Sequence, residues 1–334
     1  MNIVWCILGC LLFFSIIMDI IQTTLSMQGG GWLTGRISHY FWKAALKISG
    51  NNGRSRILDH VGYFLLVIIL TTWVMVLWLS LFLLLNFSAE TVLNSTTKMP
   101  ADIWEKIYYA GYTISTLGVG DYIAGTNLWR IVTNIYSFTG IIFLTMSVTY
   151  FIPMISAVIE QRKLGIKLSS LGDSPQQIIL NHWNGKDFSQ FTSQVMDIAD
   201  SLIQYSQHHR AYPIIHYFHN SKEKNTIILQ LAKLFETLIL MKYALKEDVK
   251  PSLRDLKPLE IAFENYTEVI FEVTYLTRKE DQVEFPQTLD LKEQNMMFSE
   301  GDFSELTKED AEIRRVFKML VHQDGWKWND IENQ

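Results

Sequence analysis

Three long apolar runs constrain the fold of this 334-residue chain more than any other feature of its sequence. The runs cover residues 2–22, 61–87 and 131–159, and Asp19 is the one residue with a formal charge inside them. A helix needs roughly 20 apolar residues to cross about 30 Å of hydrocarbon. Each run reaches that length, and helices in the cores of globular proteins rarely do. The runs therefore predict three transmembrane helices.

Basic residues in the connecting segments predict the orientation of these helices. Residues 23–56 contain Arg36, Lys43, Lys47, Arg54 and Arg56 but no acidic residue. Cytoplasmic loops carry an excess of Lys and Arg, so we expect this segment in the cytoplasm. The segment between the second and third runs has no basic excess, and further basic residues follow the third run. We expect a multi-pass protein of the plasma membrane with its N-terminus outside and its C-terminus in the cytoplasm.

A glycine-containing motif lies between the second and third runs. It consists of Thr116, Leu117, Gly118, Val119, Gly120 and Asp121. Glycine adopts left-handed backbone conformations at little cost, and alternating handedness lets consecutive carbonyl groups point the same way. Stacked carbonyl oxygens can replace the hydration shell of a cation. The motif therefore predicts a strand of an ion-selectivity filter.

Residues 104–159 resemble the prokaryotic pore-loop potassium channel family, in which two helices flank one pore loop, with an extra span added before them here. The resemblance implies K⁺ binding at Thr116, Leu117, Gly118 and Val119, with Gly120 completing the filter. Leu117 replaces the usual valine or isoleucine of the family. Val119 replaces an aromatic residue whose ring packs behind the filter and braces its diameter, which leaves a non-selective cation channel as an alternative.

The resemblance also implies roles for residues around the filter. Tyr108 and Tyr109 take the places of the family's tryptophan pair on the pore helix. Tyr112 takes the place of a buried carboxylate in some members, so we expect its hydroxyl to bond Asp121 and support the filter. Gly140 lies where many members have the gating hinge of the inner helix.

One filter strand cannot enclose a pore, so the chain is expected to form a homotetramer in the lipid bilayer. The expected function is passive conduction of K⁺, with K⁺ as the permeant ion and no other cofactor. Two further alternatives remain open. One is an active-transport subunit, although transporters with related filters carry four degenerate motifs in one chain. The other is a membrane sensor or scaffold with a vestigial pore.

The expected fold is an all-α membrane protein with three transmembrane helices, a re-entrant pore helix and filter, and an α-helical cytoplasmic domain. Its expected parts are an N-terminal anchor at 1–25, a cytoplasmic or interfacial amphipathic helix within 26–58, a pore domain at 59–160 and a cytoplasmic domain at 161–334. Within the pore domain we expect the outer helix at 61–87, the pore helix at 101–115, the filter at 116–121 and the inner helix at 128–159.

Two features before the pore domain carry specific expectations. Ile37, Phe41, Ala44 and Ile48 recur at helical spacing opposite a basic face, which is typical of a helix in the membrane interface; a cytoplasmic connector helix is the alternative. Asp19 is expected to be a structural anchor near the inner end of its helix, where its carboxylate can snorkel toward the interface or meet a basic residue such as Arg36. Because intramembrane carboxylates are often functional, an ion ligand is the alternative.

The C-terminal half is expected to be helical throughout. An apolar seam recurs at spacings of four and three, which indicates a bundle helix or a short coiled coil: Ile227, Leu231, Leu234, Leu238, Met241 and Leu245. Further helices are expected at 176–183, 188–207, 259–276 and 308–322. The half is mildly acidic, so nucleic-acid binding has no electrostatic basis, and it contains no GxGxxG motif for a dinucleotide. Its ligand or partner is unknown.

No arrangement of a nucleophile with a base indicates an enzyme. His208, His209, His216 and His219 cluster in the sequence, and a metal or pH sensor is conceivable there. We expect these histidines to be hydrogen-bonded or exposed instead, because Tyr212-Pro213 interrupts a continuous helix and no cysteine lies nearby.

Overall fold

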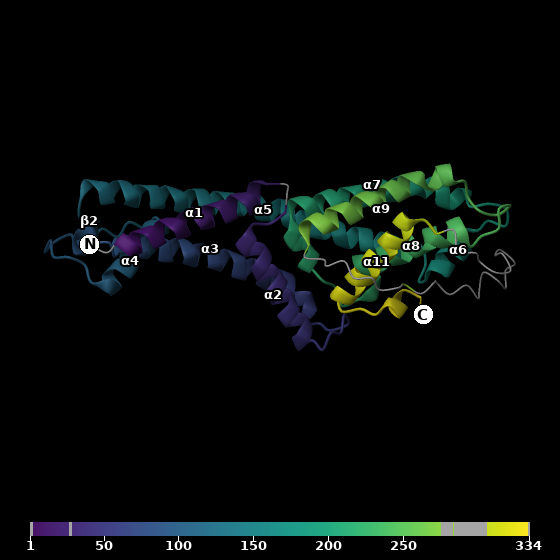
Figure 1. The fold of residues 1–334 in the computed structure, drawn as a ribbon, viewed down its shortest axis with the longest axis horizontal. Coiled ribbons are helices and arrows are strands. Elements are labelled where there is room, and N and C mark those ends of the chain that lie inside the picture. The colour runs from purple at the N-terminus through teal and green to yellow at the C-terminus, as the bar shows by residue number, and fades with distance from the viewer. Residues whose placement is uncertain (1–2, 27–28, 275–282, 284–305, 333–334) are drawn as a thin grey trace. The chain divides into compact units, whose positions relative to one another are not determined.

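The computed structural model describes residues 3–26, 29–274, 283 and 306–332, and these are almost entirely helical (Figure 1). Within this part of the chain, three helices are long and apolar enough to cross a membrane: Ile3–Leu25, Leu58–Leu85 and Asn127–Ser169. The chain divides into two compact units. One unit contains the first two spans, the segment that follows them and the third span as far as Pro153. The other contains residues 38–63, the end of the third helix and the C-terminal helices.

The first unit is built on four helices. They are α1 (Ile3–Leu25), α3 (Val61–Leu85), the short α4 (Ile103–Ile114) and the part of α5 (Asn127–Ser169) that ends at Pro153. After α3 comes the 3₁₀ turn η2 (Ala89–Thr91). The strands β1 (Val92–Asn94) and β2 (Tyr122–Ala124) pair antiparallel and bracket α4. The core of this unit packs α3 and α4 against the start of α5, with Leu81, Tyr109 and Tyr136 among its buried residues.

Asp19 is fully buried in α1 and is the main polar contact among the helices of this unit. Its Oδ1 accepts hydrogen bonds from the backbone N–H groups of Leu33 (2.8 Å) and Thr34 (3.3 Å). Its Oδ2 accepts from the Thr34 hydroxyl at 2.6 Å and from Trp73 Nε1 at 2.9 Å. Helix α2 begins at Trp32, so the carboxylate caps the helix N-terminus, where its charge is favoured.

Asp19 is therefore a structural anchor, as the sequence indicates, but the expected partner Arg36 is wrong. The Arg36 guanidinium lies over the ring of Trp32. Four donors from α2 and α3 already surround the carboxylate, and they satisfy it without a cation.

Helix α2 (Trp32–Ile48) has a packed face and, beside it, a less covered apolar stripe. The side chains that pack inward are Thr34, Ser38, Trp42 and Ala45. The apolar stripe singled out in the sequence lies beside this packed face: Ile37 and Phe41 are half-buried, while Ala44 and Ile48 are exposed. An uncovered apolar stripe is what a helix in the membrane interface requires.

The second unit is a helical bundle. It includes the 3₁₀ turn η1 (Leu58–His60) and the end of α5. The elements that follow along the chain are α6 (Pro175–His182), α7 (Ser189–Ala211), η3 (Pro213–Tyr217), η4 (Glu223–Asn225), α8 (Ile227–Tyr243), α9 (Leu253–Val273), α11 (Lys308–Gln323) and η6 (Trp328–Ile331). Helices α7 and α9 lie side by side along most of their lengths (Figure 1).

Helix α8 is the centre of this bundle, because every residue from Ile227 to Met241 is buried. It packs against α6, α9 and α11. Its polar positions find internal partners: the Glu236 carboxylate accepts two hydrogen bonds from the buried Arg314 guanidinium, at 2.7 and 2.9 Å. The apolar seam of the sequence thus belongs to a bundle helix and not to a coiled coil.

The other helices of this unit lie close to their expected positions. Thr307 caps α11 by accepting a hydrogen bond from the Asp310 N–H at 3.1 Å. The helix expected at 259–276 begins earlier, at Leu253, because Ser252 caps it and Pro258 lies in its first turns. Leu276, its expected end, lies outside the described residues.

Candidate ion pathway

Helix α4 positions the glycine motif. Asp102 and Glu105 form a reciprocal capping box at its start, with hydrogen bonds of 2.9 and 2.7 Å. At its other end the Leu117 N–H donates to the Tyr112 carbonyl at 3.0 Å, which turns the chain out of the helix. The motif therefore leaves directly from the C-terminus of α4, where the helix dipole favours a cation.

The backbone of the motif alternates in handedness. Thr116, Gly118 and Gly120 have φ values of +59°, +59° and +86°, whereas Leu117 and Val119 are not among the residues with positive φ. The two glycines were expected in this role, but Thr116 was not. A left-handed threonine costs on the order of 1–2 kcal/mol. Thr116 extends the alternation of backbone handedness by one residue. An expectation that only glycine adopts a positive φ misses this position.

A single chain leaves the motif uncovered. The exposed fractions of the Leu117 and Val119 side chains are 70% and 49%. Apolar side chains with such exposure, beside backbone carbonyls, need further chains or lipid to cover them.

A cluster of four tyrosines, Tyr108, Tyr109, Tyr112 and Tyr122, lies beside the motif. The Tyr112 ring contacts those of Tyr108 and Tyr109, each with a centroid separation of 5.1 Å, and Tyr108 contacts Tyr122 at 6.2 Å. All three contacts are edge-to-face, the arrangement that aromatic pairs prefer. The sequence pointed to three of these tyrosines but not to Tyr122.

Hydrogen bonds fix this tyrosine cluster to the surrounding elements. The Tyr109 hydroxyl contacts the Thr133 hydroxyl on α5 at 2.9 Å, and the Tyr122 hydroxyl donates to Glu105. The Tyr112 hydroxyl donates to the Tyr122 carbonyl at 2.5 Å. The expected bond from Tyr112 to Asp121 is wrong, because a hydroxyl has one hydrogen to donate and the Tyr122 carbonyl takes it. The Asp121 carboxylate instead accepts a hydrogen bond from the Tyr122 N–H at 3.1 Å.

Gly140 lies on α5 at a close approach to the end of α4. A Cβ atom there would lie 2.0 Å from the Ile114 carbonyl oxygen. One turn earlier, the Ser137 hydroxyl donates to the Thr113 carbonyl at 2.9 Å. Helix α5 continues without a break through Gly140 and Pro153 to Ser169. The structure thus gives a packing reason for this glycine, while its role as a hinge stays a prediction.

Further along α5, two hydroxyls on one face of the helix bond to their own helix. Thr145 and Thr149 donate to the carbonyls four residues earlier, at 3.0 and 2.9 Å. On the same face, Ile141 and Ile152 are exposed. This part of the α5 face is therefore predominantly apolar towards its surroundings.

The four clustered histidines do not form one site, although the rings of His209 and His216 contact each other with a centroid separation of 5.4 Å. His209 is fully buried, and its burial lowers the pKa of the imidazole well below its usual value. His219 contacts Asp324 through Nδ1 at 2.9 Å and the Gly53 carbonyl through Nε2 at 2.7 Å. Burial lowers the pKa of His219, but these acceptors outweigh it and raise the pKa above its usual value. No three His, Cys, Asp or Glu residues in the described ranges form a possible metal site.

Comparisons with known proteins bear on the first unit in particular. Residues 63–157 match the sequence model of a family described as "Ion channel". The whole chain is similar to the uncharacterized membrane protein YdjJ of Bacillus subtilis (strain 168), with 29% identity over 330 residues that cover 98% of this chain and 96% of the relative. The search of solved structures found no match.

Proposed function

Because residues 63–157 are an ion channel domain preceded by an extra helical span, we propose that this protein is a tetrameric potassium-type channel. Four copies of the Thr116–Gly120 segment surround the pore, and their carbonyl oxygens replace the hydration shell of K⁺. The observation that carries this proposal is the alternation of backbone handedness from Thr116 to Gly120. It gives consecutive carbonyls the common direction that coordination of an ion in a file of sites requires.

The exposure of the motif supports assembly into a tetramer. Leu117 and Val119 are largely uncovered in one chain, and neighbouring copies would bury them. In the proposed arrangement the parts of the chain follow the boundaries expected from the sequence, with the N-terminus outside and residues 161–334 in the cytoplasm. Gly140 is the proposed hinge of the inner helix.

The tyrosine cluster supports selectivity for K⁺ where the expected aromatic ring is missing at Val119. Its rings contact one another, and its hydroxyls bond to Thr133, Glu105 and the Tyr122 backbone. Bonds to three separate elements resist widening of the filter. This cluster takes over the bracing that an aromatic residue at position 119 would provide.

A non-selective cation channel is the second candidate, and Val119 is the residue that favours it. Its side chain carries no hydroxyl to bond the surrounding protein, so the upper part of the filter is braced only indirectly. Replacement of Val119 by Tyr separates the two candidates. If the filter is already rigid, this substitution leaves the ratio of K⁺ to Na⁺ flux unchanged. If the filter is loosely held, the substitution raises that ratio.

The test is potassium flux into vesicles that contain the purified full-length chain. Gly118→Ala places a Cβ on a left-handed residue of the filter, at φ +59°. Gly50→Ala is the matched control, since Gly50 has φ +70°, has open space around it and lies outside the channel domain. Both changes carry a similar backbone strain of roughly 1 kcal/mol.

We expect Gly118→Ala to abolish K⁺ flux and Gly50→Ala to retain it. Equal flux through both variants would show that ions do not pass along this segment. The absence of flux from the unchanged protein, together with a monomeric state in the membrane, would favour a sensor or scaffold instead.

A further inference from the structure

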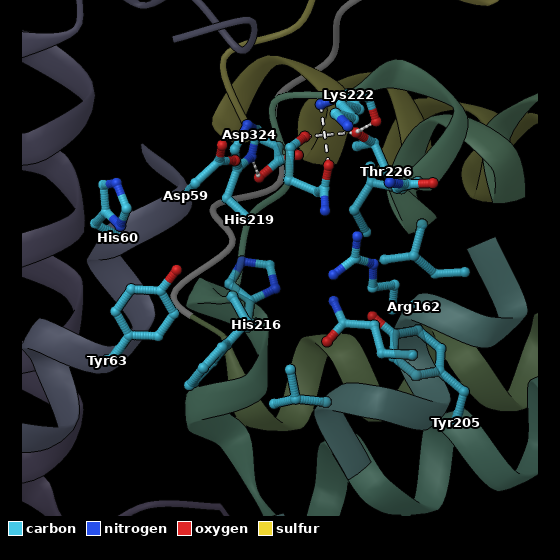
Figure 2. Close-up of a pocket in the computed structure, with 17 residues that line it drawn as sticks. Asp59, His60, Tyr63, Arg162, Tyr205, His216, His219, Lys222, Thr226 and Asp324 are labelled. Carbon is cyan, nitrogen blue, oxygen red and sulfur yellow. Dashed lines mark hydrogen bonds and ion pairs between the residues drawn. The ribbon is translucent and has the colours of Figure 1, made fainter. Parts of the chain in front are cut away.

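A pocket in the second unit has the composition of a ligand site that the channel function does not use (Figure 2). Its volume is about 360 Å³, within the range of small-molecule sites. Four segments make up most of its lining: residues 59–63 around the start of α3, residues 158–162 of α5, residues 216–222 and the start of α8. Tyr205 and Asp324 complete it. Two of these segments adjoin the membrane spans of the ion channel domain in the sequence.

Two cations of this pocket have no anionic partner. No carboxylate of the described residues lies within ion-pair distance of Arg162 or Lys222. The neighbouring Lys163, in contrast, pairs with Glu160 at 3.1 Å. In Figure 2 Arg162 and His216 point from opposite sides toward the centre of the pocket.

The carboxylates of the pocket are already engaged. Asp59 accepts hydrogen bonds from the Ser221 N–H at 2.5 Å and from its hydroxyl at 2.7 Å. Asp324 contacts His219 at 2.9 Å. Neither carboxylate contacts Arg162 or Lys222, so both cations stay available to an anionic ligand.

The start of α8 adds donors to the same pocket. Thr226 is its N-cap, but the side chain does not accept from the first-turn N–H groups. Its hydroxyl donates instead to the carbonyls of Asn220 and Lys222, at 2.7 and 3.1 Å. Ile227 and Ile228, in the first turn, line the pocket. An N-terminus without a side-chain cap attracts an anion.

A buried amide independently points to a ligand. The Gln161 side chain lines the pocket and is 7% exposed, and its Oε1 atom has no hydrogen-bond partner among the described residues. A buried acceptor left in this state costs about 1–3 kcal/mol. A hydroxyl or amine of a ligand would satisfy it.

We propose that this pocket binds an organic phosphate that also carries a hydroxyl or amine. The phosphate oxygens meet Arg162, Lys222 and the N-terminus of α8, and the hydroxyl or amine donates to Gln161. The same chemistry is present in a lipid headgroup and in a soluble phosphate ester. The ligand joins the end of α5 to the segment that precedes α8, so its binding would shift the opening equilibrium. This last consequence rests on the proposed channel function, whereas binding does not.

The experiment measures binding to the full-length protein without any measurement of ion flux. One arm compares nanodiscs of phosphatidylcholine with nanodiscs that also contain phosphatidylglycerol, whose headgroup carries hydroxyls. The other adds glycerol 3-phosphate or adenosine monophosphate to protein in phosphatidylcholine nanodiscs. The readouts are the unfolding temperature and the apparent dissociation constant, for wild type, the Arg162→Gln/Lys222→Gln double variant and the Lys163→Gln control.

We expect one arm to stabilise wild type, and the arm that does so identifies the source of the phosphate. The double variant should bind about tenfold more weakly or worse, because it loses charged hydrogen bonds, while Lys163→Gln binds as wild type. Lys222→Gln alone provides a second test if the double variant unfolds early without ligand. Stabilisation in neither arm, or equal binding by wild type and the double variant, would overturn the proposal.

Discussion

The two units of this protein bury their apolar side chains in different ways. In the second unit, α8 is enclosed along fifteen consecutive residues, and Leu231, Leu234 and Leu238 have almost no exposed surface. In the first unit, Leu117 of the filter motif and Phe138 of α5 are 70% and 66% exposed. The second unit completes its core within one chain, whereas the first leaves large apolar side chains exposed.

Equivalent leucine substitutions in the two units should have different consequences, and this is the largest effect we expect. Leu234→Ala removes a fully packed side chain and should lower the free energy of unfolding by about 2–5 kcal/mol. Leu117→Ala should leave that free energy nearly unchanged but weaken assembly. Chemical unfolding measures the first effect and native mass spectrometry the second. A large loss of monomer stability from Leu117→Ala would remove the distinction between the units.

Asp19 tests whether a polar anchor holds the loosely packed first unit together. Asp19→Asn removes the charge that accepts hydrogen bonds from α2 and Trp73, and we expect a loss of roughly 2 kcal/mol in micelles. Asp102→Asn is the matched control, since asparagine caps a helix as well as aspartate does. If both variants are equally stable, the carboxylate does not anchor the helices.

The sequence was sufficient for the backbone of the glycine motif and for the helices because both depend on local chemistry. Glycines at 118 and 120 permit the left-handed backbone found there, and the apolar seam from Ile227 to Met241 favours a packed helix. It could not identify the donors around Asp19, because they come from helices 14 and 54 residues away. The acceptor of Tyr112 depends on the path of β2, and the pocket at Arg162 depends on four distant segments.

A smaller effect concerns pH and the second unit. The pKa of His219 is raised in the folded protein, mainly because Asp324 and the Gly53 carbonyl outweigh the cost of burial, with a further contribution from Asp59. The protonated ring therefore stabilises the fold fully below its unfolded pKa of about 6.5. This stabilisation is lost as pH rises through the folded pKa.

The difference in unfolding temperature between wild type and His219→Gln isolates this contribution. We expect the difference to be largest in mildly acidic solution and to shrink toward alkaline pH. The exposed His60 provides the control, and His60→Gln should not reproduce this trend. A difference between wild type and His219→Gln that is constant with pH would contradict the assignment of a proton to this ring.

The reversal potential of the purified protein in a planar bilayer, with K⁺ on one side and Na⁺ on the other, tests the central claim most directly. Conduction through four copies of Thr116–Gly120 predicts a current whose reversal potential follows the K⁺ gradient and which Gly118→Ala removes. A reversal potential that does not change when K⁺ is replaced by Na⁺ would contradict selectivity. The absence of any current from the tetramer would contradict the channel itself.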